Sequence, residues 1–266
     1  MFDRIDYSTT RTPATQSIST SSCAIRIGGM CGRYVLARTD VAEVFSIDTV
    51  DDGLPPPSYN IAPSQQIPII INSSDPLTRR LVSARWGLIP RFATSLTSGP
   101  TPFNARVEKL DTSPLYRGLI HTQRAIIPAE GFYERRATDK QSFYIHPSDD
   151  TLLGFAGLYT WWKPSEQPNS GMFTATIITC DAQAQMTSIH HRQPLCLTPD
   201  LWEEWLDRET PCQHLIETAL NTSMSIAETL DYRTIGTDWL STRPGQRNDN
   251  PNLITELKPD YNLGLW

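Results

Sequence analysis

Short apolar runs separated by proline, glycine and polar turns dominate the middle of the chain. Runs of this length that are rich in Val, Ile, Phe, Tyr and Trp are typical of strands. The polar stretch 163–171, which contains both Pro and Gly, is typical of a hairpin loop. We expect strands at residues 67–71, 80–89, 124–134, 142–147, 152–162, 172–179 and 193–197.

Helical patterns are few. Residues 39–47 and 211–220 each predict a helix, and the clearest helical pattern lies at 198–208. Many strands, few helices and no alternation of strand with helix favour an α+β fold. We predict a single domain built on a mainly antiparallel, barrel-like β-sheet with a few peripheral helices. Four apolar side chains share one face of the helix predicted at 198–208, namely Leu201, Trp202, Trp205 and Leu206.

The sequence suggests one folded domain with two extensions. No composition break appears inside residues 31–240, so we place the domain at 30–250 and a polar tail at 251–266. Residues 1–29 are rich in Ser and Thr and lack the apolar core of a secretory signal, which predicts a disordered leader. This leader is either a propeptide that is removed or the product of a misassigned start, in which case Met30 is the first residue.

Composition narrows the function. The chain has 266 residues and a net charge of −6, which argues against non-specific binding to phosphate backbones, so any nucleic-acid site must be a local cluster of arginines. Its five cysteines are an odd number without a CxxC pair, so we expect no disulfide framework, no metal and no cofactor, and a reducing intracellular compartment. No apolar run reaches the length of a membrane span. We expect Cys23, Cys180, Cys196 and Cys212 to be buried or incidental thiols.

Cys31, in Met30-Cys31-Gly32, is a different case. If every residue before it is removed, its α-amine and its thiol lie on neighbouring carbons, and both are partly nucleophilic near neutral pH. The amine can then attack an aldehyde to give a Schiff base, and the thiol can close on the same carbon to give a thiazolidine. Gly32 leaves room for a substrate to approach the terminus. Taken alone, the motif is also compatible with an incidental thiol.

Two further segments carry candidate groups. In an extended segment Asn104 and Arg106 share a face, so an amide that holds a reacting group lies beside a guanidinium that binds phosphate or carboxylate. The alternative is a polar loop with a surface salt bridge. Glu130 and Glu134 lie in an apolar, aromatic stretch, where partial burial suits a carboxylate to proton transfer near neutral pH. The alternative is a salt bridge with Arg135 or Arg136.

Near residue 190 two adjacent histidines precede an arginine. In a strand His190 and His191 point to opposite faces, whereas His190 and Arg192 share one face and pair a general acid/base with a phosphate binder. A structural histidine is equally compatible with this pattern. Trp86 is either a core residue or a platform for an unstacked base.

Together these segments resemble a known family, the SOS response-associated peptidases, whose members are abasic-site processing proteins. The similarity runs from Met30 to about Pro194 and is carried by eight motifs in register. The resemblance implies a domain that binds single-stranded DNA at an abasic site and joins the aldehyde of the opened sugar to a mature N-terminal cysteine through a reversible thiazolidine. The motifs are MCGRY, YNIAPSQ, RWGLIP, FNARVE, IIPAEGFYE, GFAGLY, IITCDA and IHHRQP.

The resemblance also implies roles for individual residues. Cys31 is similar to the family's crosslinking nucleophile and Asn104 to the asparagine that orients the cysteine and the sugar. Glu134 resembles the glutamate of the Schiff-base proton transfers, which Glu130 does not match, and His190 resembles the histidine of ring opening and reversal. The predicted DNA contacts are Arg33, Arg106 and Arg192 to phosphates, and Trp86 to bases.

The resemblance further implies removal of the residues before Cys31, sometimes by autoproteolysis, and strand nicking by β-elimination as a side activity. We expect a monomer that acts on single-stranded DNA with abasic sites and has no membrane partner, in the cytoplasm or nucleoid of a bacterium or in a eukaryotic nucleus. Two alternatives remain open at this point. One is a cysteine hydrolase that uses Cys31 as an N-terminal nucleophile on a small amide. The other is a non-enzymatic module that binds DNA ends through its arginines.

Overall fold

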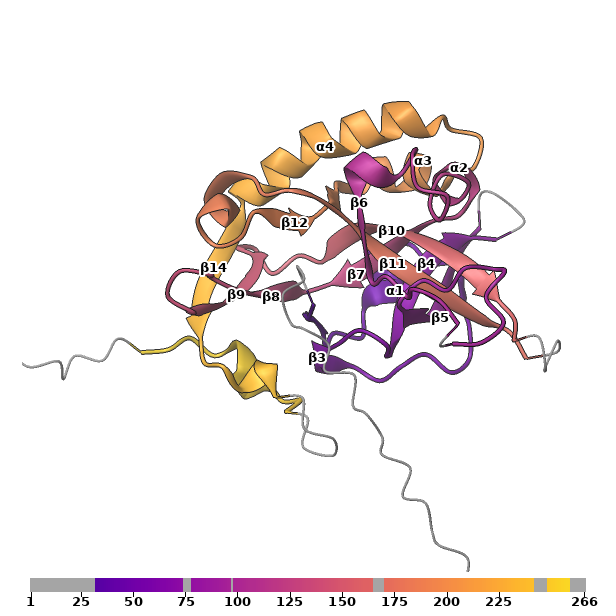
Figure 1. The fold of residues 1–266 in the computed structure, drawn as a ribbon. Helices are drawn as coiled ribbons and strands as arrows, with labels where there is room; N and C mark the ends of the chain where they lie inside the picture. Colours follow the sequence, from indigo (N-terminus) through magenta and orange to yellow (C-terminus); the bar gives the residue numbers. More distant parts are fainter. Residues whose placement is uncertain (1–31, 74–77, 97, 165–169, 242–247, 259–266) are drawn as a thin grey trace, which may run out of the picture.

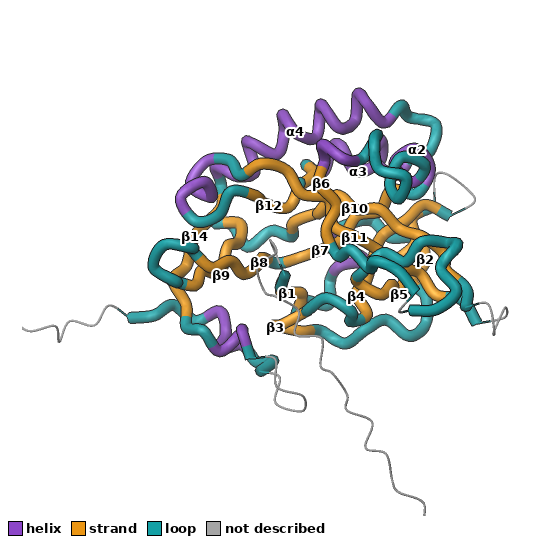
Figure 2. Tube along the Cα trace, in the orientation of Figure 1, coloured by secondary structure: helices purple, strands orange, loops and turns teal. Residues whose placement is uncertain are grey.

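The computed structural model describes residues 32–73, 78–96, 98–164, 170–241 and 248–258. Its centre is a closed ring of five strands (Figures 1 and 2). Four neighbouring pairs are antiparallel, and β5 and β11 close the ring through a parallel pairing that aligns Phe173 with Ala84. The strands of the ring are β4 (Gln66–Asn72), β5 (Arg79–Trp86), β7 (Arg124–Ala129), β10 (Leu153–Trp162) and β11 (Met172–Asp181).

The apolar runs of these strands form the core of the barrel. Ile67, Ile69 and Ile70 on β4 are fully buried, as are Ile126 and Ile127 on β7. Strands buried on both faces read as continuous apolar runs rather than as alternating ones, which is why the sequence reveals them. The prediction of a mainly antiparallel, barrel-like sheet is confirmed.

A second, antiparallel sheet of five strands lies beside the barrel. In it β1 has neighbours on both sides, because it pairs with β8 and with β3. Its order is β14 (Leu230–Ile235), β9 (Ser142–Pro147), β8 (Gly131–Arg135), β1 (Tyr34–Leu36) and β3 (Ser58–Ile61).

The strand predicted at 124–134 is in fact two strands, β7 in the barrel and β8 in the second sheet. The break falls at Glu130, whose backbone N–H donates to the carbonyl of Val35 at 2.8 Å. The Glu130 carboxylate accepts the backbone N–H groups of Ala37 and Arg38, the second at 2.7 Å. These bonds hold the corner between the two sheets against the end of β1, and they give Glu130 a structural role.

Short strands complete the sheets at their edges. The sequence did not reveal β2 (Thr49–Val50) or β6 (Asn104–Arg106), nor β1, β3 and β14 of the second sheet. The strand predicted at 193–197 is divided into β12 (Arg192–Pro194), which pairs with β11, and β13 (Cys196–Leu197), which pairs with β10.

Helices lie outside the sheets. Figure 1 shows α4 crossing one side of the barrel, with α2 and α3 close to it. The side chains predicted to share a face at 201–206 are all buried, and α4 extends past the predicted 211–220 to Glu228. The helices are α1 (Val41–Val44), α2 (Leu119–Thr122), α3 (Trp202–Leu206) and α4 (Cys212–Glu228), and the 3₁₀ turns are η1 (Val107–Lys109), η2 (Ala184–Ser188), η3 (Pro199–Leu201), η4 (Asp238–Leu240) and η5 (Pro251–Ile254).

The described part of the C-terminal segment belongs to the packed structure. Leu253 on η5 is buried with Trp239, and the backbone N–H of Leu257 donates to the carbonyl of Thr234 at 2.8 Å. The domain boundary predicted at residue 250 therefore falls inside packed structure. No helix in the described residues is both long enough and apolar enough to cross a membrane.

Candidate nucleic-acid and aldehyde site

The N-terminal end of β1 lies against β8. Their register pairs Tyr34 with Phe132, and the backbone N–H of Tyr133 donates to the carbonyl of Arg33 at 3.0 Å. If this antiparallel register continues two residues beyond the Tyr34–Phe132 pair, Gly32 lies opposite Glu134. Cys31 itself lies outside the described residues, as does Cys23, so the role of Cys31 stays a prediction.

Glu134 is a buried carboxylate at this end of β8. Its side chain is 9% exposed, and Oε1 accepts the backbone N–H of Arg135 at 3.1 Å. Immediately before β1, the Arg33 guanidinium donates through Nη1 to Oδ1 of Asn60 at 2.8 Å. Asn60 is fully buried and donates in turn to the carbonyl of Asn248 at 2.7 Å, so a buried amide orients Arg33.

Strand β6 carries the next two candidates. It pairs in parallel with β11 and places Asn104 beside Ile177 and Arg106 beside Thr179. Ala105 is 1% exposed, whereas Asn104 is half-buried and Arg106 is exposed, so the predicted alternation is confirmed. In the described part of the chain the Arg106 side chain makes no hydrogen bond or ion pair. Its guanidinium is therefore open to an anion.

His190 lies in the turn between η2 and β12. Its Nδ1 lies 3.1 Å from the backbone N of Arg192 and 3.2 Å from the carbonyl oxygen of the same residue, so the backbone of Arg192 fixes the orientation of the ring. The expected opposite orientation of the two histidines is wrong, because residues 190 and 191 precede the strand. The rings of His190 and His191 instead lie 4.3 Å apart between centroids.

The structure contradicts a phosphate contact by Arg192. The side chain is 4% exposed, and Nη1 lies 2.5 Å from a carboxylate oxygen of Glu108 and 2.6 Å from one of Asp181. Nη2 donates to the carbonyl of Thr179 at 2.7 Å and to Glu108 at 3.1 Å. Two carboxylates and a carbonyl therefore occupy the guanidinium. Arg192 therefore connects η1, which follows Arg106, to the end of β11 and to the turn that contains His190.

The structure also contradicts base stacking by Trp86. Its side chain is 0% exposed, and the indole N–H donates to the carbonyl of Phe103 at 2.8 Å. The rings of Tyr34 and Phe103 meet it edge-on, with centroids 5.3 and 5.9 Å away. The indole fills the barrel core, which is the ordinary role of a tryptophan in a strand.

Sequence reasoning missed Glu108 and Asp181, because nothing in a linear sequence pairs them with residue 192. The predicted burial of cysteines is confirmed for Cys180, Cys196 and Cys212, and burial raises the pKa of the Cys180 thiol to about 12. These three thiols are therefore protonated at neutral pH and are poor nucleophiles.

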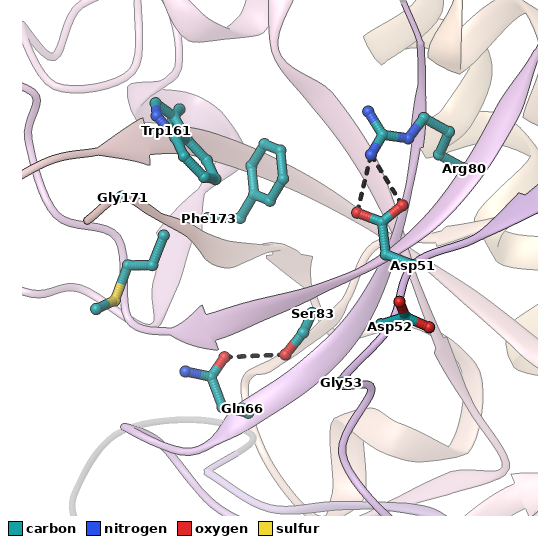
Figure 3. Close-up of a pocket in the computed structure, with 10 residues that line it drawn as sticks. Asp51, Asp52, Gly53, Gln66, Arg80, Ser83, Trp161, Gly171 and Phe173 are labelled. Atoms are coloured by element: carbon teal, nitrogen blue, oxygen red, sulfur yellow. Dashed lines mark hydrogen bonds and ion pairs between the residues drawn. The ribbon is translucent and has the colours of Figure 1, made fainter. Parts of the chain in front are cut away.

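A hollow between β2, β5, β10 and β11 lies apart from these groups (Figure 3). Trp161 and Phe173 form one side of it, and Asp51 and Asp52 form another. Arg80 is paired with Asp51, with Nη2 2.8 Å from both carboxylate oxygens. Two carboxylates against one guanidinium leave the hollow negative, and none of the predicted site residues lines it. It is therefore a poor surface for a phosphate backbone.

Replacement of Glu108 by glutamine tests the structural role of the Arg192 pair. Partial burial is the largest single effect and acts to raise the pKa of the Glu108 carboxyl. The hydrogen bonds from Arg192, a backbone hydrogen bond and the positive charge of Arg192 together outweigh it and hold the pKa below its usual value. The Glu108–Arg192 pair therefore stabilises the folded state fully above the pKa that Glu108 has in the unfolded chain. This stabilisation is lost as the pH falls through the lowered pKa of Glu108 in the folded state. We expect Glu108→Gln to unfold at a lower temperature than the wild type at pH 7.

This difference should narrow as the pH falls below about 4.5. Thermal unfolding followed by circular dichroism between pH 3 and pH 8 measures it. Glu203→Gln, on the exposed side of α3, is the matched control and should match the wild type throughout. An equal difference between wild type and Glu108→Gln at every pH would contradict the ion pair.

The chain is of the α+β class and has a closed five-stranded barrel. Its candidate polar side chains lie at two places, where β1 meets β8 and where β6 meets β11. A family model described as "SOS response associated peptidase (SRAP)" matches residues 30–238. The chain belongs to this family. The resemblance seen in the motifs is thus confirmed.

Known proteins similar to this chain include bacterial and vertebrate members. The abasic site processing protein YoqW of Bacillus subtilis (strain 168) is 40% identical over 184 residues, which cover 67% of this chain and 80% of that protein. The abasic site processing protein HMCES of Gallus gallus is 29% identical over 236 residues, with coverages of 76% and 67%. A crystal structure of a protein from Bacteroides thetaiotaomicron has the same fold, with a TM-score of 0.67 at 22% identity, over 86% of this chain and all of that one.

Proposed function

We propose that this protein binds single-stranded DNA at abasic sites and captures the aldehyde of the opened sugar through a mature N-terminal Cys31. The observation that carries the proposal is the register of β1 and β8, which pairs Tyr34 with Phe132; continued by two residues, it brings Gly32 opposite the buried carboxylate of Glu134. Relatives that are called abasic site processing proteins support it.

The covalent steps use groups of this chain. The Cys31 amine adds to the aldehyde, and loss of water gives a Schiff base. The thiol then adds to the same carbon, its proton passes to the nitrogen, and a five-membered thiazolidine results. Glu134 moves protons during formation of the Schiff base, since a buried carboxylate can serve as an acid or a base. Asn104 orients the cysteine and the sugar.

His190 assists ring opening and reversal. With Nδ1 held by the backbone of Arg192, Nε2 is the ring nitrogen that exchanges a proton with the sugar. Arg106, whose guanidinium has no partner among the described residues, contacts a phosphate near the lesion. Arg33, oriented by Asn60, contacts a second phosphate beside Cys31.

The residues before Cys31 must be removed before this chemistry can take place, because an amide nitrogen cannot form a Schiff base. We infer that removal is autoproteolytic, in keeping with the name of the family. An amine linked to an abasic sugar as a Schiff base acidifies the neighbouring C–H, so slow strand nicking by β-elimination accompanies the capture. The protein works as a monomer inside the cell.

The test mixes protein that begins at Cys31 with a single-stranded oligonucleotide from which uracil DNA glycosylase has removed one base. A protein–DNA adduct that survives a denaturing gel is the expected result. The same oligonucleotide treated first with borohydride carries an alcohol in place of the aldehyde and should give none. Protein whose intact mass shows that residues 1–30 are still attached should also give none.

Failure of the leader-free protein to form an adduct with the abasic oligonucleotide would refute the proposal. Turnover of a small amide by that protein, without any reaction with DNA, would favour the hydrolase alternative instead.

A further inference from the structure

The family match ends at residue 238, and the described residues that follow it, 239–241 and 248–258, are called the C-terminal segment below. This segment packs against the second sheet, since η5 contacts β3 and β14 and Leu253 is buried with Trp239. The indole of Trp239 stacks on the ring of Tyr133, with 5.1 Å between centroids and 10° between planes. Tyr133 directly precedes Glu134 on β8. The C-terminal segment is therefore anchored next to the strand that carries the candidate carboxylate.

Asp249 bonds this segment to β3. Its exposed carboxylate accepts the hydroxyl proton of Ser58 at 2.7 Å and the backbone N–H of Tyr59 at 2.6 Å. The Ser58 hydroxyl in turn accepts the backbone N–H of Asn60 at 3.1 Å. A single carboxylate from the end of the chain therefore holds the stretch of β3 that carries Asn60.

The amide of Asn60 has one orientation that satisfies its partners. Its Nδ2 lies 2.7 Å from the carbonyl oxygen of Asn248 and 3.3 Å from that of Trp239. A carbonyl oxygen can only accept a hydrogen bond, so the NH₂ group must face these two carbonyls and Oδ1 must face away from them. Nη1 of Arg33 donates to this Oδ1 at 2.8 Å. The backbone of the C-terminal segment thus aims the acceptor that Asn60 offers to Arg33.

Order and charge at Arg33 predict opposite effects of Asp249 on DNA binding. A guanidinium already held through Nη1 needs less further ordering when it binds a phosphate. Burial raises the pKa of the Tyr133 hydroxyl, and the charge of Asp249 raises this pKa further while that of Arg33 acts to lower it, so both charges lie near this group. By charge alone, a carboxylate so placed opposes a phosphate bound at Arg33.

We propose that Asp249 and Asn60 are positioning residues for the phosphate contact of Arg33. The C-terminal segment aims the side-chain carbonyl of Asn60, and Asn60 holds the guanidinium of Arg33 in place for the DNA backbone. Both residues act through Arg33, and neither contacts the reacting atoms. The inference rests on the proposed function and adds the C-terminal segment to the parts of the chain that this function needs.

The experiment measures binding without chemistry. The full chain and the protein that begins at Cys31 are titrated against a fluorescent single-stranded oligonucleotide that carries a tetrahydrofuran analogue, which lacks the aldehyde, and anisotropy is recorded. We expect Arg33→Gln to raise Kd by about tenfold and Asp249→Ala by about fivefold. In protein that already carries Arg33→Gln, Asp249→Ala should change Kd by less than about twofold, because the group to be positioned is absent.

Two further variants separate position from charge. Asp249→Asn loses the charge but keeps a carbonyl that can accept the N–H of Tyr59, so its Kd should be no higher than that of the wild type. Asp238→Asn is the matched control: Asp238 is an exposed carboxylate on η4, and its side chain makes no hydrogen bond among the described residues. Its Kd should lie within about twofold of the wild-type value.

Because Asp249 is exposed, Asp249→Ala empties no core site, and thermal unfolding checks that each variant is folded at the temperature of the titration. An equal or lower Kd for Asp249→Ala would overturn the inference, since charge alone would then describe the effect of Asp249. Equal weakening by Asp249→Ala with and without Arg33→Gln would also overturn it, because the effect would not pass through Arg33. The proposed function fails separately, if wild-type protein that begins at Cys31 forms no adduct with abasic DNA.

Discussion

Leader-free protein with Cys31→Ala is expected to lose the stable adduct with abasic DNA completely, while keeping a weak adduct that appears only when borohydride is added. The alanine variant still has its α-amine and can form a Schiff base. It has no thiol to close the ring, so the Schiff base hydrolyses. Borohydride reduces the Schiff base to a secondary amine and makes that species visible.

Cys31→Ser separates the two nucleophiles further. A hydroxyl is a much weaker nucleophile than a thiol at neutral pH, since its proton is far less acidic. We therefore expect Cys31→Ser to behave like Cys31→Ala. Both variants are compared with the wild type on denaturing gels with and without borohydride. A stable adduct in Cys31→Ala would place the linkage on another residue.

Trp86→Ala is expected to lower the free energy of unfolding by about 3–5 kcal/mol, the usual cost of emptying a core site of this size. The indole of Trp86 is fully buried between Tyr34 of β1 and Phe103, and its N–H donates to the Phe103 carbonyl. Its removal therefore leaves both a cavity and a buried carbonyl without its hydrogen bond. Urea unfolding followed by fluorescence measures the change.

Trp86→Phe is the control, because it keeps most of the apolar volume and should recover part of that loss. The folded fraction of Trp86→Ala should bind single-stranded DNA with nearly wild-type affinity. Unchanged stability together with a large loss of DNA affinity would restore the base-stacking role that the burial of Trp86 contradicts.

The barrel could be read from the sequence because its strands are continuous apolar runs. The second sheet could not, since β1 and β3 are short and are buried by partners distant in the chain. The run 124–134 looks like one strand, and only the hydrogen bonds of Glu130 to the β1 end show why it changes sheet there. The length of α4 was underestimated because its later turns carry Thr and Ser among the apolar residues.

Within the site, alternation along β6 was predictable because it depends only on local geometry. The fate of Arg192 was not, because a guanidinium selects its partners in three dimensions and Glu108 is 84 residues away. Trp86 shows the same limit: its sequence neighbours do not indicate whether its ring faces the core or the solvent. Glu134 and Glu130 were distinguished by family resemblance, and the bonds of Glu130 now supply the physical reason for its exclusion.

The position of β1 between two neighbouring strands has a consequence for how the terminus behaves. Tyr34 is paired with strands on both sides, and Cys31 lies three positions before it, a distance of about 10 Å at full extension. Chain length alone thus limits how far a terminal cysteine can lie from β1. Under the proposed function, a bound damaged sugar therefore meets the amine and the thiol within a small volume, and the attack of the amine on the aldehyde approaches an intramolecular reaction.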